Sequence, residues 1–223
     1  MTKPESADRW RGLLPRLAVT GIALALWFWT QSLLGGRTPP ASGIGDGLHN
    51  LTGALNVYFS QNPSAANVLL IVSSALIDAL GLFLLGRWLF GGSVRPFLGL
   101  LLLMALRQLM QAICALPAPP NMIWHYPGFP SLLVTYHVAN DFFFSGHTAI
   151  AVFGVVELSR FRRKWLTLAA MLIVVFEVAT VLILRAHYTM DVFAGIVAAL
   201  WVSQLSERIS PRLDRLLRKS PGQ

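Results

Sequence analysis

Six runs of apolar residues, each of roughly the length that crosses a lipid bilayer, divide the chain. The runs are residues 17–34, 67–90, 96–116, 142–158, 165–184 and 189–205. Gly and Pro gather at 35–47 and 117–130, as is typical of loops. The pattern predicts an all-α polytopic membrane protein with six transmembrane helices. Its parts are an N-terminal segment 1–16, a transmembrane domain 17–205 and a basic tail 206–223.

Two segments near the N-terminus allow further readings. Basic residues precede the run 17–34, as in a signal peptide, but the run is long for one and no clear small-x-small cleavage site follows it. We therefore interpret it as a retained anchor. Segment 47–65 has the character of an interfacial amphipathic helix.

The positive charges are distributed unevenly among the loops. Fifteen Lys and Arg residues fall on one side of a six-span topology: Lys3, Arg9, Arg11, Arg16, Arg87, Arg95, Arg160, Arg162, Arg163, Lys164, Arg208, Arg212, Arg215, Arg218 and Lys219. The other side has Arg37 and Arg185. Because cytoplasmic loops carry the excess of Lys and Arg, this predicts two cytoplasmic termini. Segments 35–66, 117–140 and 185–188 then face outward.

Composition agrees with a membrane protein and argues against other classes. The 223 residues are 55% hydrophobic and only 13% charged, about half the charge of a soluble domain. The net charge of +8 does not indicate nucleic-acid binding, since the charges flank the apolar runs. The single cysteine, Cys114, forms no intrachain disulfide.

Candidate chemistry is concentrated at the ends of two apolar runs. His187 and Asp191 are four residues apart at the start of the last run, so on a helix they share one face. A carboxylate on one imidazole nitrogen fixes the tautomer and exposes the other nitrogen as a nucleophile or base. Arg185, just before, is placed to hold a phosphate oxygen.

A second histidine opens the fourth run. His147 follows Ser145 and Gly146, where the free N–H groups of a helix start form an anion site. Asp141, shortly before, is a candidate to orient His147 or raise its pKa, so that His147 serves as a general acid. Under the predicted topology both histidines reach the same membrane face, which points to phosphate-ester chemistry on a lipid.

Simpler readings exist for each residue alone. A single interfacial His is usually structural, Asp and Thr at a helix start are usually caps, and a His/Asp cluster can bind metal. The coincidence of Ser-Gly-His with His-x-x-x-Asp on spans that end at the same face favours the functional reading, without a metal or other cofactor.

These motifs resemble the sphingomyelin synthase family, within the type 2 phosphatidic acid phosphatase superfamily. The matching stretches are Asp141-x-x-x-Ser145-Gly146-His147-Thr148, His187-Tyr188-Thr189-x-Asp191-Val192, and Leu106-Arg107 followed by Leu116-Pro117. The resemblance covers about residues 66–205. It implies that His187 is the nucleophile, Asp191 its partner and His147 the group that protonates the leaving oxygen. It also adds Ser145, Gly146, Arg185, Tyr188 and Arg107 as candidates for binding the substrate phosphate.

The chain departs from the wider pattern in several places. Asn140 replaces a glycine, and Arg185 stands where synthases often have His. Arg95-Pro96 lacks the lysine of the phosphatase motif Lys-x(6)-Arg-Pro and lies at the cytoplasmic face, which favours the synthase branch.

Three charges fall inside predicted spans and should face the bundle interior: Asp78, Arg107 and Glu177. One reading pairs Arg107 with Asp78 or Glu177 as a structural ion pair. The other has Arg107 reach into a substrate chamber and bind phosphate.

The resemblance implies a lipid phosphotransferase that moves phosphocholine or phosphoethanolamine from a glycerophospholipid, through a phospho-histidine, to ceramide, diacylglycerol or water. The alternatives are a lipid phosphatase acting on phosphatidate or polyprenyl pyrophosphate, and a non-catalytic lipid-binding or transport protein. Expected partners are the two lipids and the bilayer, with no nucleic acid; a homo-oligomer is left open. The compact chain favours a bacterial inner membrane, with the site at the periplasmic face.

Overall fold

The computed structural model describes residues 43–134, 136 and 142–218, together with six positions between 22 and 32. Residues 46–223 form one compact unit, which is described here by itself. Segment 1–16 and most of the predicted first span, 17–34, lie outside the described residues, so both stay predictions. Asp141 also lies outside them.

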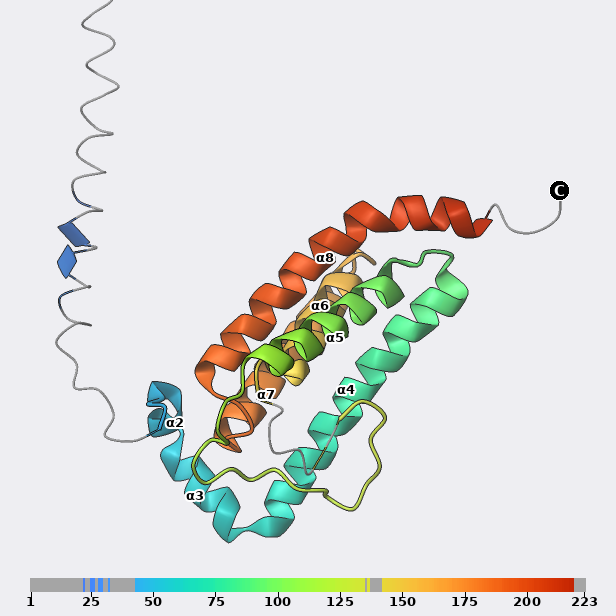
Figure 1. Ribbon diagram of the computed structural model, residues 1–223. Coiled ribbons are helices and arrows are strands. Elements are labelled where there is room, and N and C mark those ends of the chain that lie inside the picture. The colour runs from blue at the N-terminus through green and yellow to red at the C-terminus, as the bar shows by residue number, and fades with distance from the viewer. Residues whose placement is uncertain are drawn as a thin grey trace, which may run out of the picture. The chain divides into compact units, whose positions relative to one another are not determined.

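The described part of this unit is built from helices (Figure 1). Their order is α2 (Gly47–Leu51), α3 (Gly53–Gln61), α4 (Pro63–Gly91), α5 (Arg95–Ile113), α6 (Gly146–Ser159), α7 (Lys164–Ile183) and α8 (Thr189–Arg218).

Four of these helices are long and apolar enough to cross a membrane: α4, α5, α7 and α8. They coincide with the second, third, fifth and sixth predicted spans, which supports an integral membrane protein. The predicted fourth span is shorter than expected, because α6 has 14 residues and reaches only about 21 Å at 1.5 Å per residue. The six-span prediction is therefore confirmed only in part.

The short helix α6 lies at the centre of the bundle. It packs against α4, α5, α7 and α8, and its first eight residues after Gly146, His147–Gly154, are all buried. The non-helical residues 142–145 that lead into it are largely buried too, with Phe142 4% and Phe144 2% exposed. Irregular backbone at membrane depth needs protein partners for its carbonyls. For the carbonyls of Phe142 and Phe144 those partners are His187 and Arg107.

The last helix continues past its predicted end. The sixth span is predicted to stop at 205, whereas α8 runs to Arg218 with Pro211 inside it. Figure 1 shows α8 curving toward its C-terminal end. A proline removes one helical hydrogen bond and is a common cause of such bending.

Segment 47–65 differs from the predicted amphipathic helix. It forms α2 and α3, and its polar residues His49 and Asn56 are buried against the protein. Asn56 Nδ2 donates to the carbonyl of Ile183 at 2.9 Å, at the end of α7. These two short helices are thus fastened to the bundle end from which α8 starts.

The other end of the bundle carries a cluster of paired charges, which we call the charged end: Arg95, Glu157, Arg160, Glu207 and Asp214. The buried Glu157 accepts from Arg95 Nη2 at 2.7 Å and lies 3.3 Å from Arg160 Nε. Arg160 also binds Glu207 at 3.0 Å. Asp214 accepts from the Val94 N–H at 2.7 Å and so caps the start of α5. This cluster joins α5, α6 and α8.

Candidate active site

The two predicted motifs meet where α6 and α8 begin. Ser145 caps α6, accepting from Thr148 N at 3.3 Å and from Thr148 Oγ1 at 3.0 Å. The Ser145 N–H donates to the Asp191 carbonyl at 3.1 Å. A Cβ on Gly195 would lie 2.8 Å from the Ser145 carbonyl oxygen, so only glycine allows α8 this close approach. The predicted convergence of the motifs is seen in the fold.

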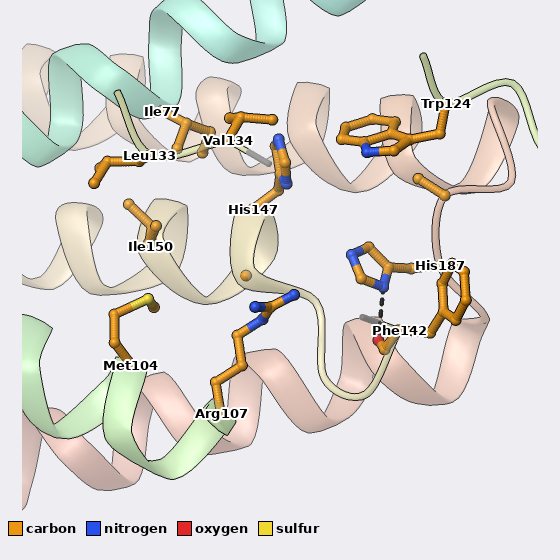
Figure 2. A pocket seen from close by; sticks show the side chains of 12 residues that line it. Ile77, Met104, Arg107, Trp124, Leu133, Val134, Phe142, His147, Ile150 and His187 are labelled. Carbon is orange, nitrogen blue, oxygen red and sulfur yellow. Dashed lines mark hydrogen bonds between the residues drawn. The ribbon is translucent and has the colours of Figure 1, made fainter. Parts of the chain in front are cut away.

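His187 is held in one orientation by a backbone carbonyl. Its Nδ1 lies 2.8 Å from the Phe142 carbonyl oxygen, and because a carbonyl only accepts, Nδ1 carries the proton. Nε2 is then the unprotonated nitrogen of the neutral ring. Figure 2 shows this second nitrogen turned into the pocket, away from Phe142. This is the tautomer that a nucleophilic histidine requires.

Asp191 does not make the predicted hydrogen bond to His187. Its Oδ2 lies 3.8 Å from Nδ1 and instead accepts from the Tyr188 N–H at 2.8 Å. The hydrogen bond to Nδ1 is made by the Phe142 carbonyl instead, and the role of Asp191 as partner of His187 stays a prediction. Asp191 is fully buried, so its charge still acts on the imidazole at short range.

His147 lies in the same pocket. It is 7% exposed, and its Nε2 is buried with no hydrogen-bond partner among the described residues. The Trp124 ring stands edge-on to it, with 5.1 Å between ring centroids. A buried polar nitrogen of this kind costs free energy unless a ligand or substrate satisfies it. Its placement fits a group that exchanges a proton with a bound molecule.

Arg107 brings a positive charge to this pocket from α5. Its Nε donates to the Phe144 carbonyl at 3.0 Å, in the irregular segment before α6. A Cβ on Gly146 would lie 3.1 Å from Nε, so the missing side chain leaves room for the guanidinium. His147, His187 and Arg107 all line a cavity of about 60 Å³ (Figure 2). That is room for roughly four water molecules, or one phosphate-sized group.

The other two mid-span charges have their own partners. Asp78 accepts from Ser131 Oγ at 2.9 Å and from the Leu132 and Leu133 N–H groups at 2.8 and 2.9 Å. Glu177 accepts from Ser73 Oγ at 2.6 Å. The reading in which Arg107 reaches a substrate chamber therefore fits better than an ion pair with either carboxylate. Asp78 instead fixes the loop whose Leu133 forms part of the pocket wall.

Three further candidates do not line the pocket. Arg185 donates to the carbonyls of Pro120 at 2.9 Å and His49 at 3.4 Å, and its predicted phosphate contact stays a prediction. The Tyr188 ring is 1% exposed and stacks on His49. The Ser145 hydroxyl caps α6, as described above. These three residues lie outside the pocket lining.

Asp46 and His49 are functional neighbours that sequence reasoning missed. The Asp46 carboxylate accepts from Thr189 N and Thr189 Oγ1, both at 2.6 Å, at the first turn of α8. Burial raises the pKa of Asp46, but hydrogen bonds from Thr189 and His49 outweigh it and hold the pKa below its usual value. His49 Nε2 donates to the His187 carbonyl at 2.9 Å. The available signal was an Asp one residue before a helix start, a typical N-cap.

Metal chemistry gains no support from these side chains. Across the residues that the structure describes, no group of three or more His, Cys, Asp or Glu is placed to hold a metal ion. The polar groups that line the cavity are two imidazoles and a guanidinium. Such a set suits an anion.

The fold and site define a class: a helical membrane protein with two histidines and an arginine around a small buried pocket. The sequence model of the AtPDCT1/2 family matches residues 46–208, so the chain belongs to that family. It is 22% identical to phosphatidylcholine:diacylglycerol cholinephosphotransferase 1 of Arabidopsis thaliana over 165 residues. That stretch covers 74% of this chain and 54% of the plant protein, so the chain spans about half the length of this curated relative. No solved structure matches significantly.

The family match begins at the residue where the compact unit begins. Asp46 opens both, and it is also the residue that binds the start of α8. The matched region thus contains the pocket and the polar residues behind it. The resemblance to sphingomyelin synthases rests on the motifs alone and stays a prediction.

Proposed function

We propose that the chain is a membrane lipid phosphotransferase that moves phosphocholine from a phosphatidylcholine-type donor to a diacylglycerol acceptor, through a phospho-histidine on His187. The observation that carries the proposal is the pocket itself, where the Nε2 atom of His187 faces His147 and Arg107 in a space of phosphate size. The printed name of the plant relative, a phosphatidylcholine:diacylglycerol cholinephosphotransferase, supports the choice of lipids.

The first half-reaction breaks the bond between phosphorus and the glycerol oxygen. His187 Nε2 attacks phosphorus, the glycerol oxygen leaves, and His147 donates a proton to that oxygen, which gives neutral diacylglycerol. Phosphocholine remains bound to His187. The ring now carries a positive charge, and its Nδ1–H still donates to the Phe142 carbonyl oxygen. The buried carboxylate of Asp191, 3.8 Å from Nδ1, stabilises that charge.

The second half-reaction reverses these steps with another lipid. The hydroxyl of the acceptor gives its proton to His147 and attacks phosphorus, and the bond between phosphorus and Nε2 breaks. The protonation states of His147 and His187 return to their starting point, so no other co-reactant is needed. Diacylglycerol is the favoured acceptor because of the plant relative; ceramide and water are the competing acceptors that the experiment includes.

Two features of the pocket suit a phosphodiester. The guanidinium of Arg107 and the first N–H groups of α6 provide positive potential for the phosphate oxygens. Trp124 borders the same cavity, and an indole ring attracts a quaternary ammonium through its π face. A donor with a choline head group would use both. Replacing Trp124 by Leu should therefore reduce discrimination between choline and ethanolamine donors.

The test is transfer by the purified protein in lipid vesicles. Phosphatidylcholine labelled in its choline group is supplied with diacylglycerol, ceramide or neither, with EDTA present throughout. The proposal expects label to appear in new phosphatidylcholine when diacylglycerol is added, and expects the His187→Ala protein to be inactive. Release of free phosphate from phosphatidate, with inert diesters, would assign a phosphatase. Binding without turnover of any lipid would assign a non-catalytic protein.

A further inference from the structure

The catalytic pocket is too small for a whole phospholipid. Its volume of about 60 Å³ accommodates a phosphate-sized group, yet a phospholipid has two long acyl chains. The chains must leave the pocket along a surface that is apolar and open to the membrane. Such a surface should begin at the pocket wall.

A groove that meets these requirements lies between α5 and α8. Its volume is about 440 Å³, and all nine side chains that line it are aliphatic, aromatic or Met. Leu106 and Met110 come from α5, and Val197 and Trp201 from α8. Phe143 and Phe144, from the segment before α6, also line it. Val197 is 48% and Trp201 55% exposed on the outside of the unit.

The groove adjoins the pocket along three consecutive residues. Phe142 lines the pocket, whereas Phe143 and Phe144 line the groove. The Phe144 carbonyl accepts from Arg107 Nε, and Leu106, the neighbour of Arg107, is a groove residue. One short wall therefore separates the phosphate-sized space from an apolar channel that opens toward lipid.

We propose that this groove holds one acyl chain of the donor phospholipid while its phosphate lies between His187 and Arg107. The inference rests on the proposed function and names a part of the substrate that the pocket cannot contain. A chain that slides in from the bilayer stays in apolar surroundings throughout, so the groove contributes little binding energy by excluding water. Its effect is to hold the phosphate in line with Nε2.

The first test fills the groove. Val197→Trp places a large ring in it, and Leu200→Trp is the matched control, since Leu200 is 45% exposed on the same helix and does not line the groove. Each variant is assayed with dioleoyl and with dihexanoyl phosphatidylcholine. Because a displacement of about 1 Å in a reacting group costs up to about 100-fold in rate, Val197→Trp should lower kcat/KM for the dioleoyl donor at least about tenfold. With the dihexanoyl donor, Val197→Trp should have the same kcat/KM as wild type. Leu200→Trp should match wild type with both donors.

The second test locates the chain directly. Phosphatidylcholine with a photoreactive diazirine in one acyl chain is irradiated with the inactive His187→Ala protein, and the labelled peptides are identified by mass spectrometry. We expect labels on the α5 and α8 residues that line the groove. Adding the Val197→Trp substitution should abolish this labelling. Labelling confined to other faces would overturn the inference.

Three kinetic results would also overturn it: no loss with Val197→Trp, an equal loss with both donors, or a loss that follows only the chain length of the acceptor. All of these presuppose transfer by the wild-type protein. If the wild type transfers nothing, the proposed function fails first; if it transfers but the groove variants have no selective effect, only the groove assignment fails.

Discussion

The two ends of the helical bundle use their polar residues in opposite ways. At the charged end, Glu157 is buried between Arg95 and Arg160, and each of these two arginines has a nitrogen within 3.3 Å of its carboxylate. At the pocket end, His147 Nε2 and Asp191 Oδ1 are buried with no hydrogen-bond partner among the described residues. The charged end places a buried carboxylate between two arginines, whereas the pocket end leaves His147 Nε2 beside a cavity with no hydrogen-bond partner among the described residues.

This difference indicates that the charged end contributes mainly to stability and the pocket end mainly to chemistry. A buried charge without a partner is costly, so charged groups that only hold helices together are expected to be paired. Buried polar atoms that persist without partners are common where a substrate supplies the missing interaction. Substitutions at the pocket end should therefore lower turnover, whereas substitutions at the charged end should lower stability.

After His187→Ala, which should be inactive, the largest loss should follow His147→Ala. Without a proton donor the diacylglycerol oxygen would leave as an alkoxide, so transfer should fall by about 10⁴-fold, the upper end for general acid catalysis. An aryl phosphodiester, whose leaving group needs no proton, should regain most of the lost rate. The measurement is turnover of both substrates by wild-type and variant proteins. If the aryl ester is as slow as the natural lipid, His147 is not the general acid.

Asp191→Asn should cause the next largest loss. At 3.8 Å and an effective dielectric constant of about 20, the carboxylate stabilises a positive imidazole ring by about 4 kcal/mol, so turnover should fall up to about a thousandfold. Asn keeps an oxygen that accepts from the Tyr188 N–H, so the thermal unfolding temperature should change little. A large loss of stability together with normal turnover of the folded fraction would make Asp191 a structural residue.

The two arginines near the site should differ. Arg107 lines the pocket, and Arg107→Gln should lower turnover by about 100-fold, as loss of one charge-stabilising donor does elsewhere. Arg185 binds two loop carbonyls, and Arg185→Gln should cost about 1 kcal/mol of stability with near-normal turnover. Steady-state kinetics and thermal unfolding of both variants test this contrast. Equal kinetic losses would support Arg185 as a phosphate ligand.

The smallest effect on turnover should come from the charged end. Glu157→Gln leaves Arg95 and Arg160 without their buried carboxylate, so unfolding free energy should fall by about 3 kcal/mol. Activity per folded molecule should stay close to wild type, because the site lies at the other end. Glu207→Gln is the matched control: its side chain is 57% exposed, and the loss should be under about 1 kcal/mol. A specific loss of turnover in Glu157→Gln would couple the two ends.

Apolar run length anticipated the architecture well, since α4, α5 and α7 lie within a few residues of the predicted spans. The fourth span is not confirmed at α6, because a helix enclosed by four others is apolar for packing and need not span the bilayer. Apolar run length also ended α8 too early, at 205. Hydropathy falls there as Arg208, Arg212 and Arg215 appear, but Asp214 ties that part of the helix to the start of α5.

The site was predictable where the motifs stand at the starts of two helices that begin at the same face. The motifs around His147 and His187 placed both histidines at one pocket without structural information. Contacts across the fold were out of reach: the Phe142 carbonyl that orients His187 has no sequence signature, since every residue has one. Likewise, the role of Arg185 depended on loop carbonyls of Pro120 and His49, which lie far away in the sequence.

The central claim is that His187 becomes covalently linked to phosphocholine, and peptide mass spectrometry tests it most directly. The protein is mixed with phosphatidylcholine without an acceptor, quenched in alkali because phospho-histidine is labile in acid, and digested. The account predicts a mass increase equal to phosphocholine on the peptide that contains His187, lost on adding diacylglycerol and missing from His187→Ala. Full transfer activity with no adduct on His187 in wild type, or transfer by His187→Ala, would contradict it.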